Sequence, residues 1–165
     1  MGNLTVIALR VVLVMMFAGS LFVQIVMVPL LGVDLREADP DVAAIRTPLV
    51  VLTVLIILAL QAAVVCVGGL LTMVRRGTVF SSSAFRLVDI VIGAFTAASL
   101  LTFGLGVALA PGEAVAPGVV LLIGGVAVMI AAVALIVLVL RALLAQAVDR
   151  DAEARKLRTE LDEVI

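Results

Sequence analysis

The sequence predicts an all-α fold, an integral membrane four-helix bundle with a C-terminal cytoplasmic helical extension. Hydrophobic residues make up 65% of the chain and charged residues 14%, whereas a soluble domain is about half apolar and about a quarter charged. The chain also contains separate apolar stretches, each long enough to cross about 30 Å of hydrocarbon as a helix. These stretches lack the alternation of a β-barrel, so helices are the expected spanning elements.

Each expected span has its own sequence signals. The four stretches cover residues 5–31, 48–74, 87–110 and 117–140. The first has no basic residue before it, is longer than the apolar part of a signal peptide and lacks a small-x-small cleavage site, so we expect it to remain as a span. Asp39-Pro40 looks like a cap followed by a first-turn proline, which predicts that the second helix begins about two turns before its membrane part.

The connection between the second and third spans is predicted to be a tight corner. We expect Gly77 to end the second helix in the left-handed conformation and Ser81 to cap the third. Phe80, directly before the cap, can pack on Phe85 as a hydrophobic staple. These residues therefore form a candidate structural or partner site.

Orientation follows from the positions of the basic residues. Arg75, Arg76 and Arg86 surround the corner between spans two and three, and most of the remaining Arg and Lys residues follow span four. Acidic residues dominate the first connection, and Glu113 is the charge in the third. Basic loops stay in the cytoplasm, so we expect a multi-pass protein with both termini inside. Heavy Ala, Val and Arg usage is typical of a GC-rich bacterial genome, which places the protein in a bacterial plasma membrane.

Asp89 is the only acidic residue within a predicted span. An ionisable side chain inside a membrane is a functional candidate, and its partner should be named. Arg86 lies one turn earlier on the same helix, and Arg10 and Arg141 are expected at a similar depth on helices one and four. We favour a shallow ion pair with long arginine side chains over a proton-transport site.

Uncharged polar residues are expected at one level near the membrane midplane. Ser20, Gln61, Thr96 and Ser99 share this level by counting from the span ends, with Gln24 about one turn further out. Such residues can form a substrate-binding layer, or they can simply hydrogen-bond neighbouring helices together. We favour the second interpretation.

The C-terminal segment is predicted to be a separate functional unit. We divide the chain into a transmembrane domain, residues 1–147, and a cytoplasmic amphipathic helical tail, residues 148–165. A three-four spacing, interrupted by Arg150, joins the apolar positions Leu143, Ala147, Ala154, Leu157, Leu161 and Val164. This seam indicates self-association or docking of a partner, although a tail that folds back under the bundle is an equal alternative.

Several chemistries are excluded by composition. The chain contains no histidine and one cysteine, Cys66, so it lacks Cys/His zinc sites, a disulfide and an imidazole base. We find no phosphate-binding loop, no metal-ligand cluster and no nucleophile beside a base. We therefore predict no catalytic, metal or cofactor-binding residues and no enzyme activity. The net charge of −1 also gives no basic field for direct contact with nucleic acid.

Two segments carry a resemblance to a known family. Arg-Gly-Thr-Val-Phe-Ser at residues 76–81 and the acidic, leucine-bearing terminus at residues 157–165 resemble the DUF2975 family of small bacterial four-span membrane proteins. The family is uncharacterised, so the resemblance implies no active site, cofactor or substrate. Its members are often encoded beside a small helix-turn-helix regulator, which implies a transcriptional regulator as partner.

These observations lead to one functional expectation and one alternative. We expect a non-enzymatic interaction or regulatory module that docks a cytoplasmic partner, with self-association as a further use of the tail. The alternative is a small transporter or channel subunit, which the polar midplane residues and Asp89 would serve.

Overall fold

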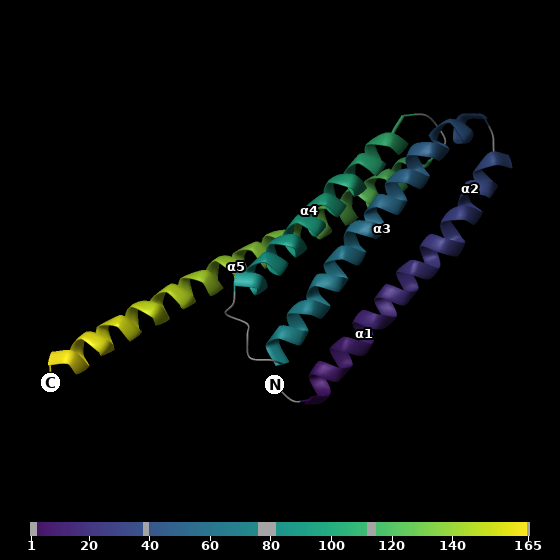
Figure 1. Cartoon of the computed structure of the whole chain (residues 1–165). Helices are drawn as coiled ribbons and strands as arrows, with labels where there is room; N and C mark the ends of the chain where they lie inside the picture. The colour runs from purple at the N-terminus through teal and green to yellow at the C-terminus, as the bar shows by residue number, and fades with distance from the viewer. Residues whose placement is uncertain (1–2, 38–39, 76–81, 112–114, 165) are drawn as a thin grey trace.

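The computed structural model describes residues 3–37, 40–75, 82–111 and 115–164, and these are almost entirely helical (Figure 1). The helices are α1 (Asn3–Phe22), the π-helical turn η1 (Val23–Met27), α2 (Val28–Glu37), α3 (Pro40–Arg75), α4 (Ser82–Leu109) and α5 (Pro117–Val164). Four helical stretches, the first of them formed by α1, η1 and α2 together, are long and apolar enough to cross a membrane. The predicted all-α membrane fold is therefore confirmed.

The helices of the bundle pack in the order in which they occur along the chain. Helices α1 and α2 pack on α3, α3 packs on α4, and α4 packs on α5. Among the described residues, other pairs of long helices make at most marginal contact. Short connections make sequence neighbours antiparallel, so the start of α1 and the end of α5 lie on the same side of the bundle (Figure 1). We call this side the terminal face.

The first membrane-spanning helix contains a π-turn whose position is explained by Pro29. The N–H of Val28 donates to the carbonyl of Val23, five residues earlier. A proline within a helix has no N–H, and its ring clashes with the carbonyl four residues before it. A wider turn directly before Pro29 relieves this clash and lets the helix continue to Glu37.

The centre of the bundle is built from small side chains on α4. Ala94, Ala98, Thr102 and Gly106 recur every four residues and are buried, with Ala98 fully covered. A Cβ atom added at Gly106 would lie 3.4 Å from the side chain of Ile123 on α5. Close approach of this kind is how membrane helices gain contact energy, because lipid removes most of the hydrophobic driving force.

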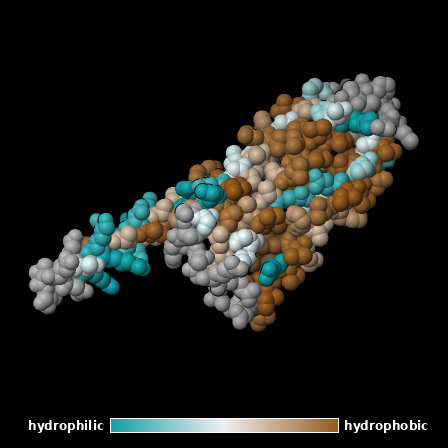
Figure 2. Space-filling view, viewed as in Figure 1, coloured by the Kyte–Doolittle hydropathy of each residue, from teal (hydrophilic) through white to brown (hydrophobic). Residues whose placement is uncertain are grey.

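The outer surface of the bundle is apolar. Leu, Ile, Val, Met and Phe side chains are exposed along all the spans. They cover most of the bundle in the space-filling view, whereas hydrophilic residues gather on the projecting part of α5 and in a few smaller patches on the bundle (Figure 2). An exposed apolar surface of this size in a multi-pass chain is the surface that contacts the lipid bilayer.

Helix α5 is longer than a membrane crossing requires. Its 48 residues correspond to about 72 Å at 1.5 Å per residue, more than twice the hydrocarbon thickness. The helix continues beyond the bundle instead of turning back beneath it (Figure 1). The expected continuation of the fourth helix is thus present, and the folded-back alternative is not the conformation of the described chain.

Two further local predictions have different outcomes. Helix α3 begins at Pro40, as the Asp39-Pro40 pair predicts, and it continues through Pro48. The predicted corner residues Gly77, Phe80 and Ser81 lie outside the described residues, so the cap and the staple stay predictions.

Candidate functional site

A buried glutamine joins α1 to α3 near the middle of the second span, Arg46–Met73. Gln61 is only 7% exposed, and its Nε2 atom donates to Oγ of Ser20 at 3.0 Å and to Oε1 of Gln24 at 3.2 Å. Ser20 in turn donates to the carbonyl of Phe17 at 2.8 Å. Gln24 belongs to the π-turn, so the irregular part of the helix supplies one acceptor. We call Ser20, Gln24 and Gln61 the glutamine cluster.

The other predicted midplane residues lie apart from this cluster. Thr96 donates to the carbonyl of Ile92 on its own helix at 2.8 Å. Ser99 donates to the carbonyl of Ala127 on α5 at 2.9 Å. The polar residues therefore form local and pairwise contacts, and the described residues do not converge on one substrate-sized layer.

Asp89 forms an ion pair with Arg141 at the interface of α4 and α5. Nη2 of Arg141 donates to Oδ2 of Asp89 at 2.9 Å. Nε lies 2.5 Å from Oδ1, although this second contact lacks hydrogen-bond geometry. The side chains of Arg141 and Asp89 are 33% and 51% exposed, and such open pairs contribute at most about 1 kcal/mol. This geometry agrees with a shallow structural ion pair.

The other two candidate partners of Asp89 have different surroundings. Arg86 and Arg10 are exposed, and neither forms a hydrogen bond or ion pair with the residues that the structure describes. Arg10 lines a groove between α1 and α3, away from the ion pair. The sequence placed all three arginines at a similar depth, but depth alone does not give the direction in which a side chain points.

The C-terminal part of α5 presents its predicted seam to the surroundings. Leu157 is exposed, as are the earlier seam positions Leu143, Ala147, Arg150 and Ala154. Leu161 and Val164 lie within α5, although their side chains are outside the described set. Asp151 and Arg155 form an ion pair one turn apart at 3.0 Å. Nothing in the described chain covers this face.

Potential metal ligands and thiols are sparse among the described residues. They contain no group of three or more Cys, Asp or Glu side chains able to hold a metal ion, and Cys66 is a half-buried free thiol. The polar groups that the structure brings together are instead suited to holding helices in contact.

Comparison with known proteins gives a family and no activity. The search of curated proteins and the search of solved structures both returned no match. A family model described as "Protein of unknown function (DUF2975)" matches residues 30–165, which include all of α3, α4 and α5. Because this match covers well over half of the sequence, the chain belongs to the DUF2975 family.

Proposed function

We propose that this protein is a membrane anchor that docks a cytoplasmic protein through the projecting part of α5. The observation that carries the proposal is the continuity of α5 from the membrane to Val164. From Arg141, which marks the terminal face, the helix extends for about 35 Å. A rod of this length lifts its side chains clear of the lipid headgroups, where a soluble protein can reach them.

The proposed orientation places the terminal face in the cytoplasm of a bacterium. Support comes from the basic residues of the tail and of the corner between α3 and α4, because Arg and Lys are retained on the cytoplasmic side during insertion. The acidic residues of the connection between α2 and α3 would then lie outside. The projecting helix would share a compartment with transcriptional regulators.

The chemistry of the projecting helix favours a protein partner over the lipid surface. Its apolar seam is narrow, with Ala147, Ala154 and Leu157 separated by Arg150. The other faces carry both acidic and basic residues, whereas a helix that lies on anionic lipid has a mainly basic polar face. A narrow seam with mixed charges beside it is typical of helix-to-helix docking.

The test is co-purification after crosslinking in the native host, with partners identified by mass spectrometry. The full-length protein is compared with a form ending at Ala147 and with Leu157→Asp, which places a charge in the seam. Thr159→Asp is the matched control, because it adds the same charge on a different face of α5. Thr159 is exposed and donates its hydroxyl to the carbonyl of Arg155.

The proposal expects a soluble partner that is retained by Thr159→Asp and lost with Leu157→Asp and the truncation. If that partner is a DNA-binding regulator, its target genes would also indicate the cellular process. A partner set unchanged by truncation at Ala147 would contradict docking through α5.

The transport alternative has less support from the geometry. The donors and acceptors of the glutamine cluster bind one another, and Asp89 is paired with Arg141. Solute flux into proteoliposomes that is abolished by Gln61→Leu or Asp89→Asn would nevertheless favour this alternative over docking.

A further inference from the structure

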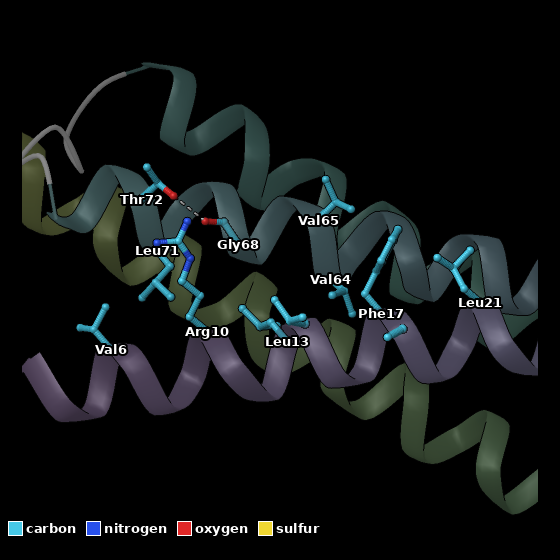
Figure 3. Close-up of a pocket in the computed structure, with 12 residues that line it drawn as sticks. Val6, Arg10, Leu13, Phe17, Leu21, Val64, Val65, Gly68, Leu71 and Thr72 are labelled. Atoms are coloured by element: carbon cyan, nitrogen blue, oxygen red, sulfur yellow. Dashed lines mark hydrogen bonds between the residues drawn. The ribbon is translucent and has the colours of Figure 1, made fainter.

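An apolar groove runs along the outside of the bundle between α1 and α3 (Figure 3). Its volume is about 380 Å³, and α1 contributes Leu13, Phe17 and Leu21 to one wall while Val64 and Leu71 of α3 form the other. The groove lies on a lipid-facing surface, because α1 packs against α3 and has its other sides exposed. In a bilayer this groove would face the acyl chains of the lipid.

One end of the groove holds an unpaired positive charge. Arg10 extends from α1 towards the turn of α3 that contains Gly68 and Thr72 (Figure 3). It forms no hydrogen bond or ion pair with any residue that the structure describes. Thr72 donates its hydroxyl to the carbonyl of Gly68 at 3.0 Å, so the guanidinium of Arg10 is the group here with unused donors.

The sequence gives Arg10 no counter-ion on either helix of the groove. Residues 1–33 and 48–75, which form these helices within the membrane, contain no Asp or Glu. The acidic residue of the spans, Asp89, is paired with Arg141. A guanidinium remains charged under all physiological conditions and matches the geometry of a phosphate. The donors of Arg10 are therefore available to an anion from outside the chain.

The length of the groove fits one leaflet of the bilayer. From Arg10 to Leu21, α1 rises about 16 Å at 1.5 Å per residue. Half of the hydrocarbon core is about 15 Å. A lipid whose phosphate lies at Arg10 would thus have an acyl chain that ends near Leu21, level with the glutamine cluster.

A second hollow lies on the other side of Arg10. It has a volume of about 350 Å³ and is lined by Ile7, Val11 and Met15, together with Val6, Arg10 and Val14, which it shares with the groove. Arg10 therefore stands on a ridge between two apolar hollows. One phosphate with two acyl chains is the arrangement of a glycerophospholipid.

We propose that Arg10 and the groove between α1 and α3 form a binding site for an anionic glycerophospholipid of the leaflet at the terminal face. The phosphate binds the guanidinium of Arg10, and one acyl chain lies between Phe17 and Val64. The site does not depend on the docking role of α5, because the two lie on different helices.

The test is lipid binding to the purified full-length protein in mild detergent, counted by native mass spectrometry. Phosphatidylglycerol and phosphatidylcholine with identical acyl chains are titrated separately. One interfacial arginine corresponds to about a fivefold gain in affinity for an anionic lipid. The proposal expects the first phosphatidylglycerol to bind about fivefold more tightly than phosphatidylcholine, and Arg10→Gln to abolish that preference.

Two matched controls separate the site from general charge and general surface. Arg86→Gln removes an arginine that is also exposed and also unpaired among the described residues, but lies on α4. Gly68→Leu fills the groove, because a Cβ atom there meets nothing within 4 Å, and Gly93→Leu makes the same change at an open position of α4. Arg86→Gln should keep the preference, and Gly68→Leu but not Gly93→Leu should weaken binding of both lipids.

Several results would overturn the proposal. Equal affinity for the two lipids, a preference that survives Arg10→Gln, or an equal loss in Arg86→Gln would show that Arg10 does not select an anionic lipid. Glycerol phosphate that competes as strongly as the whole lipid would show that the apolar groove contributes nothing. Circular dichroism and gel filtration of each variant confirm that a loss of binding does not come from unfolding.

Discussion

Helices α4 and α1 are both apolar membrane spans, yet they are held in the bundle in different ways. In the most apolar stretch of α4, 22% of the residues are buried within the protein, compared with 6% in the first span. The buried residues of α4 include the small side chains Ala94, Ala98 and Gly106, whereas α1 exposes Val14, Met15 and Met16. Residue size distinguishes the central helix from the edge helix, because small residues permit close helix contact.

The difference also extends to the forces that hold each helix. Helix α4 lies between α3 and α5 and contacts both along its length. Helix α1 contacts α3 and is attached to it through the hydrogen bonds of Gln61. Packing thus holds the centre of the bundle, while a small polar cluster holds its edge.

The largest effect is expected when a residue at the centre of the bundle is enlarged. Ala98 is fully covered, so Ala98→Leu must push α4 away from a neighbouring helix. We expect a loss of about 1–3 kcal/mol in the free energy of unfolding, measured by titration with a denaturing detergent. Ala97→Leu is the control, because Ala97 is exposed on the same helix. Equal losses in both variants would mean that α4 is not tightly packed at Ala98.

The second largest effect is expected from removal of the polar attachment of α1. Gln61→Leu removes both hydrogen bonds to the first span. Interhelical hydrogen bonds in membranes average about 0.6 kcal/mol, so we expect a loss of about 1 kcal/mol. Hydrogen exchange should become faster in α1 and stay unchanged in α4. Thr96→Val, which removes a hydroxyl bonded within its own helix, is the control, and unchanged exchange in α1 would contradict the polar attachment.

A smaller effect is expected from the ion pair between α4 and α5. Because Asp89 and Arg141 are partly exposed, a double-mutant cycle with Asp89→Ala and Arg141→Ala should give a coupling energy of about 0.5 kcal/mol. This coupling should become weaker at high salt. A coupling of several kcal/mol, insensitive to salt, would show that the pair is more than a surface contact.

The smallest effect is expected at the projecting part of α5. Leu157→Ala should change the stability of the bundle by less than about 0.5 kcal/mol, because Leu157 is exposed on the projecting part of α5. The unfolding curves of Leu157→Ala and of the unmutated protein in denaturing detergent should therefore coincide. A clear shift would mean that the tail takes part in the fold, and the distinction between bundle and tail would have to be abandoned.

Much of this fold was predictable from the sequence. The apolar runs predicted the four spans, and Asp39-Pro40 predicted the start of α3 at Pro40. The three-four pattern after Leu140 gave the continuation of α5. The positive charge of Arg141 and its expected depth in the membrane made it one of the candidate partners of Asp89. Each of these features depends on residues close in sequence or on the position of a residue across the membrane.

The arrangement of side chains around each helix was harder to predict. A helix that is apolar on all sides has no face that stands out, so the separation of Thr96 and Ser99 from the glutamine cluster was missed. The groove at Arg10 was missed for the same reason. Pro29 was the available signal for the π-turn, because a proline within a span must disturb the hydrogen bonds before it.

The π-turn has a consequence for the rotational phase of the first span. Gln24 and Gly32 are eight residues apart, and in an α-helix eight residues overshoot two full turns by about 80°. Yet Gln24 is hydrogen-bonded to α3 and Gly32 is buried where α2 meets α3. A π-turn contains more residues per turn than an α-helix, so it reduces this overshoot. One irregular turn thus lets a single edge helix face the same neighbour on both sides of the membrane midplane.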